Sequence, residues 1–289
     1  MAKTHRKYWF RMAARSAYLL IRPSNTAALV DKSYDRISPT YDRAWTDHMR
    51  NLTEHLIDRL NPQPGNTCID LTCGTGFATS LLAAKTDTTV TGVDRSQGML
   101  DQARQNHAHN CKFVQADILE FLKNRPTASA DIITCCWGLG YSRPFAVLRQ
   151  IKRVLKPHGK VAIIDNSLFS LREIIFCSFL TFAENPRALQ NVMHFKFLPG
   201  PRTLRTMFAM LNLKTLHSDQ GSRSYTVDTG RDAIARLKST GAAAGFEYAS
   251  GRTDDTAIFD RFAQIIEDKY MTPDGIKVTH RYLAGIAQK

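Results

Sequence analysis

The sequence predicts an α/β fold in which helices cover both faces of a mostly parallel, doubly wound sheet. Two observations support this prediction. From residue 66 onward, short apolar runs alternate with amphipathic stretches, which is the pattern of consecutive βαβ units. Residues 68–79 (CIDLTCGTGFAT) also lead an apolar strand into an acid, a glycine turn and a helix, and the next apolar run, 90–94, ends in Asp94.

The elements follow from apolar periodicity and from start and stop signals. Thr46 is expected to cap a helix whose apolar face carries Met49, Leu52, Leu56, Ile57 and Leu60. Strands are expected near 66–71, 89–94, 112–115, 131–136 and 160–165, with helices near 78–86, 97–107 and 144–155. Later, Asp232–Thr240 predicts a helix ended by Gly241 or Gly245, and Lys277–Ala287 predicts a final strand.

The glycine turn predicts a pocket for a nucleoside-bearing cofactor. Gly74 and Gly76 lack a Cβ, so the chain can turn sharply and a ligand can lie against bare backbone. The helix that starts near Ala78 directs free N–H groups toward the turn. Asp94, roughly 20 residues past the turn, is placed to accept hydrogen bonds from a ribose diol.

The residues around the turn favour a cationic cofactor over a dinucleotide. A dinucleotide fingerprint has a third glycine where this chain has Thr79. Asp70, just before the turn, would repel a pyrophosphate and attract the ammonium group of an amino acid. S-adenosylmethionine carries an ammonium and a sulfonium and no phosphate, so it fits the sequence better.

On these motifs the chain resembles the class I S-adenosylmethionine-dependent methyltransferases over roughly residues 33–166. Asp70–Gly76 is similar to the first motif, with Thr72 in place of its first glycine. Gln115–Ile118 is similar to the stretch that contacts the adenine amine, Asp131–Tyr141 to the fourth strand and its loop, and Val154–Val161 to the turn before the fifth strand, with His158 replacing a glycine. The resemblance implies cofactor contacts from Asp70, Thr72, Gly74, Gly76, Asp94, Arg95, Met99, Asp117, Ile118 and Trp137.

The resemblance also implies a seven-stranded, Rossmann-like sheet closed by a β-hairpin. Residues 1–30 are expected to form a basic arm, and 31–289 a single domain with a lid insertion after the fifth strand, at about 167–228. The insertion is apolar and aromatic. One interpretation is a lid over a lipophilic substrate, and the other is that these aromatic residues only pack the lid onto the domain.

The arm carries six basic residues and no acid. Trp9, Met12, Ala13, Ser16, Leu19 and Leu20 recur at helical spacing on one face, and this combination is typical of a helix on an anionic membrane surface. The alternatives are a helix that covers the cofactor pocket, a nucleic-acid contact, a docking helix for a partner, and a mitochondrial transit peptide.

Residues 34–42 (YDRISPTYD) are similar to a segment of quinone-biosynthesis C-methyltransferases and bacterial phospholipid N-methyltransferases. In those families the segment folds over the cofactor, which makes Tyr41 a candidate for contact with the methionine end or the acceptor. The alternative is that both tyrosines only anchor the segment.

Methyl transfer is a direct displacement, so positioning and exclusion of water can supply most of the acceleration. The candidates near the acceptor are Tyr41, Tyr141 and Asp165, followed by Asn166, with His48 and His194 weaker. The loop 136–141 (CWGLGY) lacks the Pro-Pro motif of enzymes that methylate DNA bases, which makes nucleic acid an improbable partner despite a net charge of +13. Trp137 is expected to flank the adenine or the acceptor, or simply to pack under the lid.

The predicted function is S-adenosylmethionine-dependent methylation of a small or lipophilic acceptor, with a phospholipid amine or a quinone precursor favoured. The alternatives are methylation of a soluble metabolite and a non-catalytic module that binds S-adenosylmethionine or a nucleotide. The chain has no apolar run of membrane-spanning length and no evident signal peptide, and its six cysteines match no common zinc spacing. We therefore expect no metal and a cytoplasmic protein, with peripheral contact to a membrane through the arm as the favoured interpretation of residues 1–30; the sequence does not predict the oligomeric state.

Overall fold

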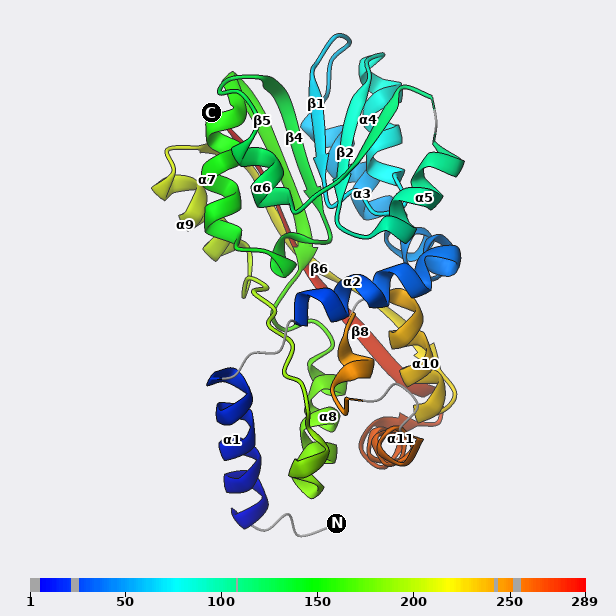
Figure 1. Cartoon of the computed structure of the whole chain (residues 1–289). Helices are drawn as coiled ribbons and strands as arrows, with labels where there is room; N and C mark the ends of the chain where they lie inside the picture. The colour runs from blue at the N-terminus through cyan, green and yellow to red at the C-terminus, as the bar shows by residue number, and fades with distance from the viewer. Residues whose placement is uncertain (1–5, 22–25, 108, 242–243, 252–255) are drawn as a thin grey trace. The chain divides into compact units, whose positions relative to one another are not determined.

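The computed structural model describes residues 6–21, 26–107, 109–241, 244–251 and 256–289, apart from the side chains of Arg6 and Lys7 (Figure 1). Its contacts divide the chain into two compact units. Unit 1 comprises residues 1–33, 171–194 and 223–280, and unit 2 comprises residues 34–170, 195–222 and 281–289. The cofactor motifs all lie in unit 2.

Unit 2 is built on the predicted sheet, whose strands follow the order β3-β2-β1-β4-β5-β8-β6. Neighbouring strands from β3 to β5 pair in parallel, and β8 pairs antiparallel with β5. A short eighth strand, β7, pairs only with β8 and adds to the seven strands expected. The strands are β1 Cys68–Leu71, β2 Val90–Asp94, β3 Cys111–Gln115, β4 Ala130–Cys136, β5 Leu155–Asn166, β6 Lys214–Val227, β7 Met271–Thr272 and β8 Gly275–Gln288.

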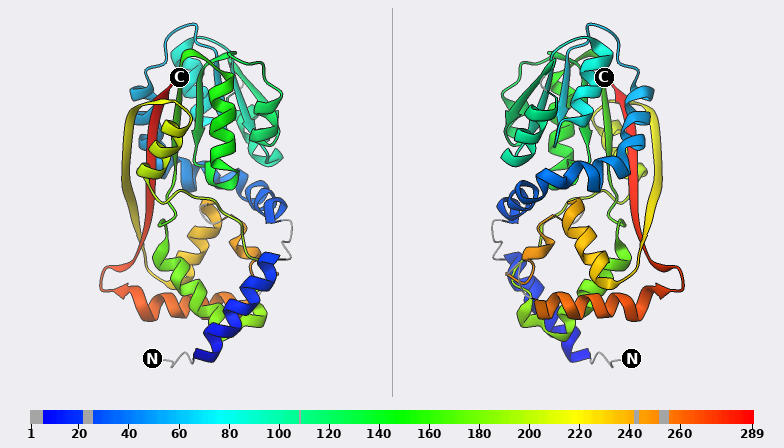
Figure 2. Two further views of the ribbon diagram at one scale, coloured as in Figure 1. Left: turned by 90° about the vertical axis from the view of Figure 1, so that its left-hand side faces the viewer. Right: turned by 90° about the vertical axis from the view of Figure 1, so that its right-hand side faces the viewer.

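Helices cover both faces of this sheet, as expected for a doubly wound fold (Figures 1 and 2). On one face, α6 Ile118–Lys123, α7 Pro144–Val154 and α9 Pro201–Met210 share a core with the strands. On the other face, α3 Asp47–Leu60 and α4 Phe77–Thr86 form a second core. Because both faces are buried, the central strands are mostly apolar, and β1 has no exposed position.

The chain enters the sheet through helical turns that the sequence did not specify. The 3₁₀ turn Ser38–Thr40 is followed by the π-helical turn Asp42–Thr46, which continues directly into α3. The expected cap at Thr46 is therefore wrong. Thr46 has helical backbone angles, and its hydroxyl donates to Asp42 Oδ1 at 2.8 Å instead of capping α3.

Unit 1 is a helical body with its own apolar core. Helix α11, Thr256–Tyr270, which the sequence did not predict, packs on both α8, Arg172–Glu184, and α10, Gly230–Thr240, and the three helices share one core. Helix α1, Arg6–Ile21, joins a smaller core beside α8 and the 3₁₀ turn Pro186–Ala188. Helix α2, Thr26–Ile37, begins in this unit, which also holds the 3₁₀ turn Phe246–Tyr248.

These two units differ from the expected arm, single domain and lid. Residues 195–222, within the expected lid, belong to unit 2 because α9 and the first part of β6 complete its sheet layers. Residues 223–280, expected in the main domain, belong to unit 1 because α10 and α11 bury their apolar faces in one core with α8. Periodicity identifies a buried helix face but not the core that buries it.

Candidate cofactor and acceptor site

The glycine turn between β1 and α4 is held by the carboxylate at the end of β2. Gly74 donates its backbone N–H to Asp94 Oδ2 at 2.9 Å, and Gly74 has φ 53°. Gly76 has φ 90°, and a Cβ there would lie 2.9 Å from the Phe113 ring. The turn therefore needs glycine at Gly76 both for its backbone conformation and for the close approach of a neighbour.

Asp94 is positioned by backbone donors on both sides. Its Oδ1 accepts from Ser96 N at 3.0 Å, while Oδ2 accepts from Gly74. Burial raises the pKa of Asp94, and these N–H donors act in the opposite direction by favouring the ionised form. A carboxylate offers about four lone-pair sites, so both oxygens keep capacity for further donors such as ribose hydroxyls.

A cavity of about 50 Å³ lies over this turn and brings four predicted residues together. Thr72 and Gly74 come from the turn, Trp137 follows β4, and Tyr41 comes from the segment before α3. The Trp137 indole N–H donates to Thr53 Oγ1 at 2.9 Å, and its ring meets the Trp45 ring at a centroid distance of 5.6 Å. The cavity wall is thus built from aromatic rings and bare backbone.

Asp70, which was expected near the cofactor's ammonium group, does not line this cavity. It is fully buried in β1, where Oδ1 accepts from the Thr134 hydroxyl at 2.6 Å and Oδ2 from the Thr79 hydroxyl at 2.7 Å. Burial raises its pKa to about 6, although both hydroxyls favour the ionised form. Asp70 joins β1, β4 and α4 beneath the turn.

The remaining predicted contacts lie around the cavity, at the ends of β2 and β3. Asp117 caps α6, since its Oδ1 accepts from Leu119 N at 2.9 Å, and its Oδ2 lies 4.0 Å from the Arg95 guanidinium. Met99 and Ile118 are buried, with exposed fractions of 1% and 4%, and neither lines the cavity. Asp117 keeps one oxygen toward Arg95, whereas Met99 and Ile118 can contribute only as apolar packing.

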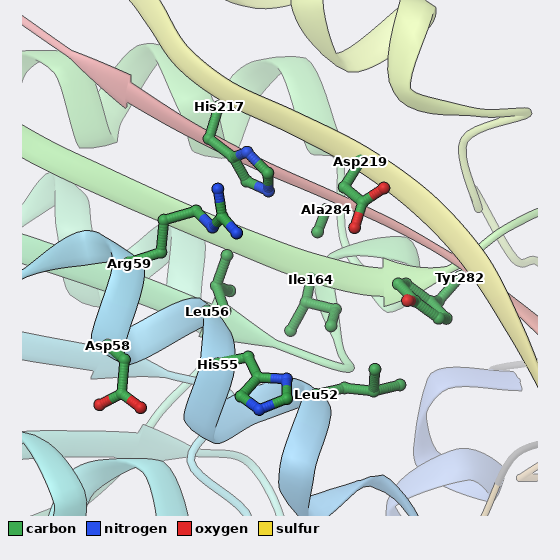
Figure 3. A pocket seen from close by; sticks show the side chains of 10 residues that line it. All are labelled: Leu52, His55, Leu56, Asp58, Arg59, Ile164, His217, Asp219, Tyr282 and Ala284. Atoms are coloured by element: carbon green, nitrogen blue, oxygen red, sulfur yellow. The ribbon is translucent and has the colours of Figure 1, made fainter.

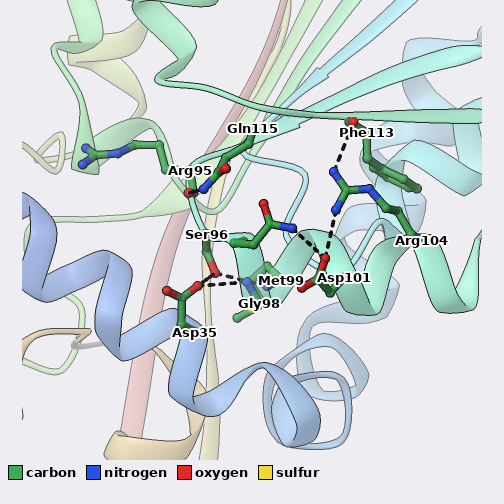
Figure 4. A network of polar contacts seen from close by, with 10 residues as sticks. Asp35, Arg95, Ser96, Gly98, Met99, Asp101, Arg104, Phe113 and Gln115 are labelled. Carbon is green, nitrogen blue, oxygen red and sulfur yellow. Dashed lines mark hydrogen bonds and ion pairs between the residues drawn. The ribbon is translucent and has the colours of Figure 1, made fainter.

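Two aspartates that sequence reasoning missed attach the segment 34–42 to both cofactor loops. Asp35 Oδ1 accepts from the Ser96 hydroxyl at 2.6 Å and from Gly98 N at 3.0 Å (Figure 4). Asp42 Oδ1 accepts from the Thr75 hydroxyl in the glycine turn. Each aspartate follows a tyrosine, so the repeated Tyr-Asp pair was the available signal.

Aromatic rings converge beside the cavity. The Tyr141 ring lies 5.9 Å from Tyr34, 5.4 Å from Phe195 and 5.3 Å from Phe197, all edge to face. Tyr34 also meets Tyr41 at 6.1 Å. Burial raises the pKa of Tyr34 and of Tyr41 well above 10, so both phenols stay protonated at neutral pH. We call these five residues the aromatic cluster: Tyr34, Tyr41, Tyr141, Phe195 and Phe197.

Asp165 supports the loop after β4 and does not line the cavity. Its carboxylate is buried, with Oδ2 accepting from Gly140 N at 2.7 Å and Oδ1 from Asn166 N at 2.8 Å. Burial raises its pKa to about 7. Asp165 thereby holds the backbone that carries Tyr141. Among the weaker candidates, His194 is exposed and belongs to unit 1.

Thr72 and Gly138 form a matched pair at the turn. Thr72 has φ 58°, an unfavourable value for a β-branched residue, and a Cβ on Gly138 would lie 2.6 Å from the Thr72 side chain. We expect Gly138→Ala to lower the free energy of unfolding by about 1–3 kcal/mol through overpacking. Adding Thr72→Gly should recover most of that loss in urea titrations, whereas additive effects would contradict the pairing.

A larger cavity of about 520 Å³ lies elsewhere in unit 2, between α3 and strands β6 and β8 (Figure 3). Apolar side chains such as Leu56 and Ile164 line it, and Arg59, His217 and Asp219 lie at its edge. None of the predicted site residues lines it. Tyr282, which does, meets the Trp137 ring at 6.3 Å and so adjoins the cofactor cavity wall.

Comparisons with known proteins identify the same region. Residues 68–159 match the family model described as a methyltransferase domain. The chain is 32% identical over 146 residues to 2-phytyl-1,4-naphtoquinone methyltransferase of Nostoc sp., a match covering 46% of this chain and 62% of that protein. It is 31% identical over 150 residues to demethylmenaquinone methyltransferase of Listeria welshimeri, covering 48% and 62%. These matches span about six-tenths of the length of the curated relatives.

Solved structures share the fold at low sequence identity. The YcgJ protein from Bacillus subtilis superposes with a TM-score of 0.56 at 18% identity, covering 83% of this chain and 98% of that one. The [4+2]-cyclase SpnF superposes with a TM-score of 0.52 at 18% identity, covering 83% and 80%. A cyclase on the same fold means that the fold alone does not decide the reaction.

Proposed function

Because the chain belongs, through residues 68–159, to the class I S-adenosylmethionine-dependent methyltransferases, we propose that it methylates a small lipophilic acceptor with a planar ring. A quinone precursor is the favoured acceptor. The observation that carries this proposal is the position of the aromatic cluster, one member of which, Tyr41, also lines the cofactor cavity. An acceptor ring held among these side chains would lie next to the cofactor.

The cofactor would be held by residues on three loops of unit 2. Asp94 has free lone pairs for the ribose diol, and the turn at Gly74 offers bare backbone. Asp117 Oδ2, which lies 4.0 Å from the Arg95 guanidinium, would also accept from the adenine amine. The bound cofactor supplies an electrophilic methyl group on a sulfonium. Asp35 and Asp42 would keep the segment 34–42 closed over it.

The chain's own contribution to the reaction would be positioning and exclusion of water. Trp137 and Tyr41 wall the cavity, and the ring edges of Phe195 and Phe197 can pack around a planar acceptor. The Tyr141 hydroxyl can donate to an acceptor oxygen. Asp165 would act as a positioning residue, since both its oxygens accept from the backbone of the β4 and β5 loops.

The names of two relatives support a quinone-like acceptor over a phospholipid amine, because both are described as acting on naphthoquinone or menaquinone precursors. A binding module without turnover is the alternative from a different class. It would hold the cofactor and yield no S-adenosylhomocysteine.

The experiment is a panel of acceptors incubated with methyl-labelled S-adenosylmethionine. We expect label in a reduced naphthoquinone that lacks the ring methyl, with an equal amount of S-adenosylhomocysteine. Label in phosphatidylethanolamine alone would replace the quinone assignment by a phospholipid amine. Tight cofactor binding with no product from quinone, lipid or soluble amine acceptors would favour the binding module.

Removing one ring of the aromatic cluster tests the acceptor site. We expect Phe197→Ala to raise the KM for a naphthoquinol acceptor about 10-fold or more, because a buried ring contact of roughly 1.5–3 kcal/mol is lost, with little change in cofactor affinity. Phe145→Ala, at a phenylalanine of α7 that is 37% exposed, is the matched control. Equal KM changes in both variants would argue against an acceptor site at the aromatic cluster.

A further inference from the structure

Unit 1 leaves large apolar side chains exposed on two helices, α1 and α8, which contact each other and lie side by side in Figures 1 and 2. On α1 the most exposed are Phe10 at 77% and Ile21 at 80%. On α8, Ile175, Phe176 and Phe179 are 41–48% exposed. Scattered apolar residues are ordinary on a protein surface, whereas several large ones gathered on two helices that contact each other are candidates for an interaction surface.

The structure shows that α1 has two apolar faces with different surroundings. Met12 is 5% exposed and packs with Leu19 against Phe182 and Ala183. Of the six residues that the sequence placed on one face, Met12 is buried and Ser16 and Leu19 are partly buried, whereas Trp9, Ala13 and Leu20 are exposed. Helix α1 therefore contacts the rest of unit 1 through only part of that face. Arg15 fixes this orientation, since its guanidinium donates to Leu189 O at 2.8 Å and to Gln190 Oε1 at 3.0 Å.

The opposite face of α1 is also apolar. Phe10, Ala14, Ala17 and Ile21 follow one another at steps of four, three and four residues, which places them in one stripe of the helix. All four are exposed, and they lie about half a turn around the helix from Met12 and Leu19. An amphipathic helix that only covered a core would carry polar residues here.

Helix α8 repeats this arrangement. Ile174, Cys177 and Thr181 are buried in unit 1, whereas Ile175, Phe176 and Phe179 form an exposed face on the other side. The Lys269 ammonium lies 5.7 Å from the Phe176 ring, which places a cation at the edge of this face. We call the stripe Phe10–Ile21 of α1 together with Ile175, Phe176 and Phe179 the apolar surface of unit 1.

The charges near this surface favour one occupant. Helix α1 contains four basic residues and no acid, and Arg11 among them is exposed. Exposed aromatic rings combined with basic residues suit the headgroup region of an anionic bilayer, where rings enter the interface and cations meet lipid phosphates. No helix among the described residues reaches the length and apolarity needed to cross a membrane, so contact from these helices would be made at the surface.

We propose that the apolar surface of unit 1 docks on an anionic lipid bilayer through α1 and α8 together. Docking would bring the enzyme to the lipid phase, in which lipophilic acceptors dissolve. The proposal is argued from unit 1 alone and does not depend on which acceptor is methylated. It differs from an arm that binds alone, because it requires α8 and uses the outer face of α1.

The test is co-sedimentation of the full chain with vesicles of phosphatidylcholine, with and without 30% phosphatidylglycerol. We expect binding to the anionic vesicles that weakens when salt is raised from 0.1 to 0.5 M. Phe10→Ser with Ile21→Ser, and separately Phe176→Ser with Phe179→Ser, should each lower the bound fraction at least 10-fold at limiting lipid. Met210→Ser with Leu216→Ser, at exposed apolar residues of unit 2, is the matched control and should change it less than twofold.

Several outcomes would overturn the proposal. If the wild-type protein did not bind anionic vesicles, or if the variants bound them as well as the wild type does, a lipid bilayer would be excluded as the partner of this surface. Dissociation of a wild-type dimer on gel filtration in the α1 variant, without vesicle binding, would assign the face to a second copy of the chain. If only one of the two double variants bound vesicles less than the wild type, the helix changed in that variant would be the sole contact, and joint docking through α1 and α8 would be refuted. Far-UV circular dichroism and thermal unfolding of the full chain serve as the check that each variant is folded.

Discussion

Replacing Asp94 with alanine is expected to weaken S-adenosylmethionine binding 100-fold or more. Two ribose hydroxyls donating to one carboxylate contribute about 1.5–3 kcal/mol each, and every 1.4 kcal/mol is a factor of ten. The same carboxylate accepts from Gly74 N and Ser96 N, so its loss also leaves the glycine turn without its support. Calorimetric titration with the cofactor measures the effect directly.

Asp101→Ala is the matched control for Asp94. Asp101 is an exposed acid on α5, Gln97–Asn106, and pairs with Arg104 at 3.0 Å on the helix surface. Its replacement should change the dissociation constant less than twofold, because exposed ion pairs contribute little. An Asp94→Ala protein with wild-type affinity and unchanged thermal stability would remove the ribose assignment, and with it the expected position of the cofactor.

The second large effect is on stability and comes from Asp165. Burial raises the pKa of this carboxyl from its usual 3.8 to about 7. The folded state therefore binds more protons than the unfolded chain between these values, so the free energy of unfolding falls as pH rises from about 4 to about 7. At 1.36 kcal/mol per pKa unit, Asp165 alone accounts for a loss of roughly 4 kcal/mol.

Asp165→Asn should flatten this dependence in urea titrations between pH 5 and pH 8. Burial also raises the pKa of Asp70, to about 6. In the Asp165→Asn variant, Asp70 should therefore still cause a smaller fall in the free energy of unfolding as pH rises through the acidic part of this range. Asp87→Asn, at an exposed position with φ 51° where asparagine is well tolerated, should leave the slope as in the wild type. Identical slopes in the wild type and Asp165→Asn would show that Asp165 stays ionised when the protein is folded.

The cofactor half of the site could be predicted because it is built from local sequence. The strand, the turn at Gly74 and the helix are consecutive, and Asp94 lies at the end of the next strand, where parallel topology places it beside the turn. Thr72, Gly74 and Trp137 line the same cavity for this reason. The strands and helices expected between residues 66 and 166 all form, with shifts of a few residues at most ends.

Asp70 marks the limit of local reasoning. Its position before the turn suggested a cofactor contact, but its hydrogen-bond partners Thr79 and Thr134 are reached only when β4 pairs with β1 and α4 packs on the sheet. The same holds for Asp35 and Asp42, whose partners Ser96 and Thr75 lie in loops far along the chain. Side-chain pairing across long separations depends on the packed structure.

Strand period, turn chemistry and chain order act over short distances, so the sequence was sufficient to predict the successive parallel strands along the chain, the glycine turn and the acid at the end of β2. The order of these strands within the sheet came only from the structure. The tertiary structure decided which faces are buried. It turned Met12 of α1 inward and left Phe10 and Ile21 outward, and it divided residues 167–280 between two units. Periodicity cannot settle these points, because an apolar stripe has the same spacing whether it meets a core, a lipid or water.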